Sequence, residues 1–244
     1  MASPLYLYCF SEAGITAPDV ASVGKTGAPF VLEHQGLAAV LSENAEARYR
    51  VSRKNLLAHN GVVEAVMAQA PTLPVRFGTL APSQDAARAL LAERNDELKA
   101  ALARLRGQVE YAVRVRWQDE QAVLADIGER DPDVVRTREA LVKRGQVDYQ
   151  AKIALGQQVE QALGARATFV ANSLTELAEQ HAERVRDNDV AGDIVNLSLL
   201  MPPERYDDFM GDVEAFDNEH GDHLRIKITG PLPPFSFAEM AITW

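Results

Sequence analysis

The stretch Leu224–Phe237 reads LRIKITGPLPPFSF and is the most informative part of the chain for its fold. Apolar residues alternate with basic ones from Leu224 to Ile228, which is typical of a half-buried β-strand. Gly230-Pro231 interrupts the alternation, and the prolines that follow favour an extended backbone. We therefore predict a strand at 224–228 and then a proline-stiffened tail, whose aromatic residues pack into a groove of this chain or of a partner.

The rest of the chain divides into strand-like and helix-like segments. In the first half we predict a strand at 3–10, a hairpin at 30–41, a helix capped by Ser52, an edge strand at 73–77 and a helix from Ser83 to about Arg106 that stops at Gly107. In the second half we predict strands at 109–117, 194–200 and 224–228, a mainly helical region at 131–186 and a helix at 204–219. Gly145, Gly156 and Gly164 argue against one unbroken helix in the long region.

This element order predicts an α+β protein of two domains. Residues 1–107 form a smaller mixed α+β domain. Residues 108–244 form a C-terminal domain with long helical segments and the proline-rich aromatic tail, and their strand-helix-strand connections suggest a ferredoxin-like, split βαβ topology.

Charge separates the two halves. The chain of 244 residues has a net charge of −10, and its Lys+Arg and Asp+Glu counts are 11 and 10 over residues 1–107 but 14 and 25 over residues 108–244. Nucleic acid is excluded as a partner because phosphate binding needs clustered cations. No stretch approaches the roughly 20 apolar residues that span a bilayer, so we expect no lipid-membrane partner. We expect a protein partner.

Composition and the N-terminus bear on the compartment. The single cysteine, Cys9, cannot form an intramolecular disulfide, and its apolar strand predicts a buried, inert thiol. The start Met-Ala-Ser-Pro has neither a basic leader nor a long apolar run, so we expect no secretory signal. A lone cysteine fits a reducing cytoplasm but would suit many exported proteins equally well. Since no secretory signal is visible, we expect a cytoplasmic protein.

No segment predicts catalysis, a cofactor or a metal. Gly24-Lys25-Thr26 resembles the end of a Walker A loop, but position 19 is Asp where that loop needs Gly, and no helix is expected to follow. His220-Gly221-Asp222-His223 could offer part of a metal site, yet a polar turn between helix and strand explains it equally well. His34, His59 and His181 are scattered, and no nucleophile motif such as Gly-x-Ser-x-Gly occurs.

Three groups of residues are candidates for binding a partner. Arg76 and Phe77 lie in the apolar segment LPVRFGT, where the guanidinium either pairs with a carboxylate, which we favour, or is presented to a partner. The helix at 204–219 carries Asp207, Asp208 and Asp212 among other acids, and forms either a solvated face or a docking face for a basic partner. Phe235 and Phe237 lie in the tail.

Four segments together resemble the gas vesicle protein GvpL/GvpF family. They are Tyr6-Leu7-Tyr8, the segment Leu73–Thr79, the strand from Glu110 to Trp117, and Gly230–Phe237. The resemblance runs nearly end to end, with Cys9 and Leu232 as departures where the family more often has Gly and Trp. None of these segments encodes a reaction.

Membership of this family would imply a two-domain α+β accessory protein of gas vesicle assembly, without enzymatic activity. It would bind the hydrophobic shell protein GvpA, prevent its aggregation and assist vesicle nucleation. Two alternatives remain at this point: a scaffold that binds other gas vesicle accessory proteins without direct shell contact, and an enzyme with an unrecognised site. The resemblance favours an F-like protein but does not separate F from L.

Overall fold

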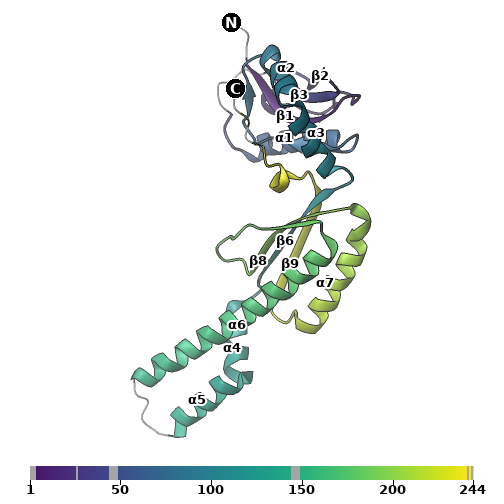
Figure 1. The fold of residues 1–244 in the computed structure, drawn as a ribbon. Helices are drawn as coiled ribbons and strands as arrows, with labels where there is room; N and C mark the ends of the chain where they lie inside the picture. Colours follow the sequence, from purple (N-terminus) through teal and green to yellow (C-terminus); the bar gives the residue numbers. More distant parts are fainter. Residues whose placement is uncertain (1–3, 26, 44–48, 144–148, 241, 243) are drawn as a thin grey trace. The chain divides into compact units, whose positions relative to one another are not determined.

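The computed structural model describes residues 4–25, 27–43, 49–143, 149–240, 242 and 244. The chain divides into two compact units (Figure 1). Unit 1 consists of Met1–Tyr111, Leu200–Pro203 and Gly230–Trp244, and unit 2 of Ala112–Leu199 and Glu204–Thr229. The predicted division at 107/108 thus falls close to the end of the first segment of unit 1. The last residues, Gly230–Trp244, belong to unit 1 and not, as predicted, to the C-terminal part.

The sheet of unit 1 is antiparallel and is built around its first strand. Its strands are β1 (Leu5–Glu12), β2 (Phe30–His34), β3 (Leu37–Glu43), β4 (Thr72–Pro74) and β5 (Leu80–Ala81). They lie in the order β2-β3-β1-β4, and β5 also pairs with β1. The predicted hairpin is confirmed as β2 and β3, joined at Gln35 and Gly36. The predicted edge position is confirmed for β4. Pro74 has no backbone N–H to donate, and an edge strand tolerates this because one of its sides has no neighbouring strand.

Both faces of this sheet are covered. Leu5, Leu7 and Phe10 of β1 belong to a core cluster with the helices α2 (Gln84–Glu93) and α3 (Asn95–Leu105). Tyr6, Tyr8 and Cys9 belong to a second cluster with α1 (Arg53–Met67). A register shift between Leu7 and Cys9 makes this possible, because it resets which residues face each side. Cys9 is fully buried, and burial raises the pKa of its thiol, as expected for an inert cysteine.

The helices of unit 1 begin where the sequence predicts. The side chains of Ser52 and Ser83 cap α1 and α2 by accepting hydrogen bonds from the N–H groups of Asn55 and Ala86. The single helix predicted from Ser83 to Arg106 is wrong in one respect: Arg94, at φ −109° and ψ 24°, separates α2 from α3.

Asn95 supports the break between α2 and α3. Its side chain donates hydrogen bonds to the carbonyl oxygens of Leu91 and Gln35, which are 3.4 and 3.3 Å away. Asparagine favours such local backbone bonds over a helix interior. The break allows Leu98, Leu102 and their neighbours on α3 to face the core.

The elements of the second half run in the order strand, helices, two strands, helix, strand. They are β6 (Val109–Trp117), α4 (Glu120–Arg130), α5 (Pro132–Lys143), α6 (Tyr149–His181), β7 (Arg184–Asp187), β8 (Val195–Met201), α7 (Tyr206–His220) and β9 (Leu224–Leu232). The four strands form a second sheet in the order β7-β8-β6-β9. The predicted strands at 109–117 and 194–200 and the acidic helix are confirmed, with small shifts of their ends. The strand predicted at 224–228 is present but does not stop before Gly230-Pro231, because β9 continues through both residues to Leu232.

The prediction of helix throughout 131–186 is partly wrong. Helix α6 ends at His181, and Arg184–Asp187 form β7. This strand is short and mostly charged, so its own sequence carries little strand signal. Gly156 and Gly164 do not interrupt α6, whereas Gly145 lies outside the described residues.

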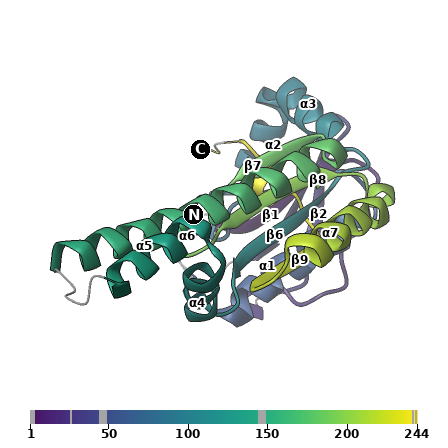
Figure 2. The ribbon, with the colours of Figure 1, turned by 90° about the horizontal axis from the view of Figure 1, so that it is seen from below.

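Helices α4, α5 and α6 pack together within unit 2. Figures 1 and 2 both show α5 beside the first half of α6. Val123 and Ile127 of α4 and Val134 of α5 are buried against Leu155, Val159 and Leu163 of α6. Farther along, α6 packs against α7. No helix of the described part of the chain is both long enough and apolar enough to cross a membrane.

Candidate interaction surfaces

The loop that carries Arg76 is held in place by hydrogen bonds to two aromatic residues of β1, Tyr6 and Tyr8. Val75 donates its N–H to the carbonyl of Tyr8 at 3.0 Å, and Gly78 donates its N–H to the hydroxyl of Tyr6 at 2.9 Å. The Phe77 ring is half-buried and makes an edge contact with the Tyr6 ring at 6.1 Å between centroids. Gly78 adopts φ 86°, a left-handed conformation that glycine tolerates better than other residues.

His59 of α1 lies beneath the same loop and is almost completely buried. Its Nε2 is 3.2 Å from the carbonyl oxygen of Val75, and its Nδ1 is 3.1 Å from the Tyr6 hydroxyl. A carbonyl only accepts, so Nε2 carries the proton and Nδ1 accepts from Tyr6. Burial lowers the pKa of His59 to about 4, which keeps the ring neutral near pH 7.

Sequence reasoning did not single out His59. A signal was present, because His59 precedes Val62, Val63 and Val66 at helical spacing and therefore shares their buried face. The structure gives this histidine a supporting role: it connects α1 to the loop at Arg76 through Val75 and Tyr6.

Arg76 itself is exposed. Its carbonyl oxygen accepts hydrogen bonds from the N–H and the hydroxyl of Thr79, at 3.2 and 2.7 Å. Within the described ranges its guanidinium forms no ion pair, so the pairing favoured from the sequence is not observed there. The geometry of the loop instead displays a cation on the surface of unit 1.

The two tail phenylalanines are packed inside unit 1. Phe237 is 5% exposed and belongs to the core cluster of α2 and α3. Phe235 is half-buried, and its ring centroid is 5.8 Å from that of His59. The groove predicted for the tail therefore lies in this chain. The backbone is also less extended than predicted, because residues Phe235–Phe237 form a 3₁₀ turn.

The three aspartates of α7 are all exposed. Asp207 and Asp208 lie in the first turn, where carboxylates complement the helix dipole. Asp212 is 2.7 Å from Nε2 of His181 on α6. The opposite face of the helix is buried through Phe209, Val213 and Phe216. The exposure of Asp207 and Asp208 is consistent with a docking face and equally with a solvated face, so it does not distinguish the two.

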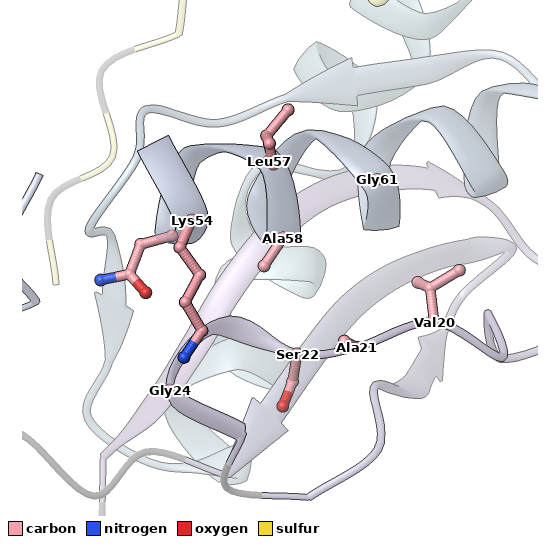
Figure 3. Close-up of a pocket in the computed structure, with 9 residues that line it drawn as sticks. Val20, Ala21, Ser22, Gly24, Lys54, Leu57, Ala58 and Gly61 are labelled. Atoms are coloured by element: carbon pink, nitrogen blue, oxygen red, sulfur yellow. The ribbon is translucent and has the colours of Figure 1, made fainter. Parts of the chain in front are cut away.

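A groove of about 290 Å³ lies between α1 and the loop 20–24 (Figure 3). Its lining is mostly apolar and consists of Val20, Ala21, Ser22, Gly24, Lys54, Asn55, Leu57, Ala58 and Gly61. Two of the lining side chains, Leu57 at 60% and Val20 at 38%, are exposed large apolar groups. Val51 at 69% and Leu56 at 37%, which are near Lys54 in the sequence, are exposed as well. The sequence does not reveal this surface, because Leu56 and Leu57 recur with Val63, Val66 and Met67 at the helical spacing that is typical of a buried face.

The two motifs that could have suggested ligand sites have structural explanations. Gly24 adopts φ 77° in a short 3₁₀ turn, and a Cβ there would collide with the ring of Tyr49; Thr26 lies outside the described residues. His220 ends α7 and His223 precedes β9, as expected for a polar turn. In the part of the chain that the structure describes, no three His, Cys, Asp or Glu side chains are grouped to hold a metal.

Comparisons with known proteins match this chain over almost its whole length. The family model described as "Gas vesicle synthesis protein GvpL/GvpF" matches residues 4–239. A gas vesicle protein F of Streptomyces sp. (strain CB03234) is 33% identical over 218 residues, which cover 89% of this chain and 91% of that protein. A gas vesicle protein F of Microcystis aeruginosa (strain PCC 7806) is 28% identical over 210 residues, covering 84% and 85%.

Solved structures agree with the sequence relatives. The crystal structure of the gas vesicle protein GvpF from Anabaena sp. PCC7120 has a TM-score of 0.84 at 25% identity and covers 99% of this chain and 100% of that one. The structure of GvpF from Microcystis aeruginosa has a TM-score of 0.75 at 26% identity, covering 98% and 100%. From the family match and these relatives, the chain belongs to the GvpL/GvpF family of gas vesicle synthesis proteins.

Proposed function

We propose that this chain is an accessory protein of gas vesicle assembly that binds the hydrophobic shell protein GvpA, prevents its aggregation and assists vesicle nucleation. The observation that carries the proposal is the family match over residues 4–239. A shell subunit with exposed apolar surface would self-associate before ordered assembly. A partner that covers this surface lowers the concentration of free subunit.

Two properties of the chain support this role. Unit 1 exposes apolar side chains around the groove at α1, which suit contact with another apolar surface. The second half of the chain carries 25 acidic against 14 basic residues, and this net charge would keep a complex dispersed. On this proposal the protein acts by binding, without catalysis, in the cytoplasm and at the gas vesicle.

A scaffold that binds other gas vesicle accessory proteins is the second candidate. The exposed carboxylates of α7 favour it, because they match a basic protein surface better than an apolar shell subunit. Arg76, displayed at the surface of unit 1, offers a second polar contact. Pairwise binding to each gas vesicle protein would distinguish the two candidates.

Two finer assignments belong to the same proposal. We assign a ferredoxin-like topology to unit 2, supported by the β-α-β-β-α-β order of its elements and by the strand order β7-β8-β6-β9. We also place the chain with the F proteins. Within one Streptomyces strain, protein F is 33% identical to it and protein L is 27% identical.

Coexpression with the cognate GvpA tests the function directly. The measurement is size exclusion chromatography of the soluble fraction, with GvpA expressed alone as the control. We expect GvpA to become soluble and to coelute with this chain. Aggregated GvpA beside a folded, free chain would reject direct shell binding and favour the scaffold.

A further inference from the structure

The groove between α1 and the loop 20–24 has a size and a lining that suit the binding of a few apolar side chains from another protein. Its volume of about 290 Å³ lies at the lower limit of small-molecule sites, which span about 300–1,000 Å³. Figure 3 shows Ala58 pointing from the helix toward the loop, while Leu57 stands on the outer side of the helix. A few apolar side chains of another protein would fill this space.

Gly61 lies in the lining of the groove and in the interior of α1. Because it has no side chain, Gly61 leaves room for the backbone of another segment to come close. Within the described structure nothing comes close, because a Cβ added at Gly61 would meet no atom within 4 Å. Lys54, Leu57, Ala58 and Gly61 follow i, i+3, i+4 and i+7 spacing, the ridge against which a second helix packs.

The start of α1, on one side of the groove, is basic. Lys54 lines the groove, Arg50 and Arg53 nearby in the sequence are exposed like Lys54, and the sequence from Tyr49 to Val63 contains no Asp or Glu; the exposed acid on the loop side is Asp19, next to Val20. Figure 3 shows the Lys54 side chain reaching from α1 toward the loop at Gly24. A partner that brings carboxylates to this side of the groove gains opposite-charge contacts beside the apolar ones.

We propose that this groove binds an amphipathic helix of a partner protein, one that carries apolar residues on one face and acidic residues flanking them. The apolar face packs on Leu57, Ala58 and Val20, the partner backbone approaches at Gly61, and the flanking carboxylates meet Arg50, Arg53 and Lys54. The biological partner rests on the proposed function, because it is a gas vesicle protein only if that function holds.

Synthetic helices test the proposal without knowledge of the partner. The probe is a fluorescein-labelled peptide of about 15 residues with Leu at i, i+3, i+4 and i+7 spacing and Glu at the flanking positions. Two matched peptides replace every Glu by Lys, or every Leu by Ser. By fluorescence anisotropy with the full chain, we expect the acidic Leu peptide to bind at least about tenfold more tightly than either control.

Variants locate the binding. Gly61→Gln places a side chain in the groove and is compatible with the helix, since there is open space around Gly61. Gly164→Gln, at an open and exposed position of α6, is the matched control. We expect Gly61→Gln, but not Gly164→Gln, to lower the affinity for the acidic peptide by at least about tenfold. The double variant Arg53→Glu/Lys54→Glu should bind the Lys peptide more tightly than the Glu peptide. We expect this variant to fold, because acidic residues near the N-terminus of a helix stabilise it.

Equal binding of the acidic and basic peptides, or unchanged binding to folded Gly61→Gln, would overturn the proposal. Coexpression of Gly61→Gln with GvpA separates this failure from failure of the proposed function. If GvpA still coelutes with the variant, shell binding stands and uses another surface. If GvpA does not coelute even with the wild-type chain, the peptide data still decide whether the groove binds helices.

Discussion

The carboxylate of Glu110 accepts two hydrogen bonds from Ser236, one from the backbone N–H at 2.8 Å and one from the hydroxyl at 2.6 Å. The two residues are 126 positions apart in the sequence, and both belong to unit 1. Glu110 is 5% exposed. These bonds fix the tail at Ser236, the residue between Phe235 and Phe237. The two phenylalanines pack against the two core clusters of the unit.

Glu110→Gln should destabilise the protein by about 1–3 kcal/mol, because a neutral amide with one accepting oxygen replaces a buried carboxylate that accepts two charge-assisted hydrogen bonds. Urea unfolding followed by circular dichroism measures the change. Glu129→Gln on α4 is the control, since Glu129 is exposed. Equal stability of the two variants would show that the bonds to Ser236 contribute nothing.

Phe237→Ala should lower the free energy of unfolding by about 3–5 kcal/mol, as is typical when a buried phenylalanine is truncated. Phe169, which is 50% exposed, provides the control variant Phe169→Ala, with an expected cost near 1 kcal/mol. Deleting residues 231–244 should lower the thermal midpoint for the same reason. If the deletion leaves the midpoint unchanged and abolishes partner binding, the tail is an interaction segment.

The stability of the protein should fall as the pH drops from about 6.5 toward 4. Burial lowers the pKa of His59 from 6.5 to about 4, so in this window the unfolded chain takes up a proton that the folded chain does not. Complete titration corresponds to about 3 kcal/mol. Urea unfolding at pH 7 and pH 5 should show a smaller loss for His59→Gln than for wild type; equal losses would contradict this assignment.

Arg76→Ala should change the free energy of unfolding by less than about 0.5 kcal/mol, because the side chain is exposed and forms no ion pair with a described residue. If the loop contacts a partner, coelution with GvpA should decrease while thermal unfolding stays the same. A clear loss of stability would instead indicate that the guanidinium is paired within the protein.

Reversing Asp207, Asp208 and Asp212 to Lys should weaken partner binding, and the deficit should shrink at high salt. The loss of dipole complementarity and of the His181 contact adds a small cost to folding, so thermal unfolding is measured in parallel. The double variant Asp207→Lys/Asp208→Lys leaves His181 untouched. The control reverses the exposed acids Asp133 and Glu139 on α5. Unchanged binding by a folded variant supports a solvated face.

Much of the secondary structure could be predicted because its signals are local. Ser52 and Ser83 cap helices through atoms only three residues away, and the alternation from Val109 to Trp117 needs one face of a sheet and nothing more. The end of a helix at Gly107 follows from a conformation that glycine adopts freely.

The candidate surfaces were less predictable. Leu57 has the spacing of a core residue but is 60% exposed, because it stands on the outer side of α1. His59 looked isolated in the sequence and is buried against Tyr6 and Val75. Whether an apolar or titratable side chain is buried depends on which segment covers it, and spacing along one helix does not contain that information.

By itself the sequence determined the α+β class, most helix starts and strands, the acidic second half and the residues that indicate the GvpL/GvpF family. Only the tertiary structure decided that the tail packs into unit 1, that Arg94 divides a helix, and that an apolar groove lies beside the basic start of α1. The physical reason is the range of the interactions: caps, turns and alternation act over a few residues, whereas the bonds of Glu110 to Ser236 join positions 126 residues apart.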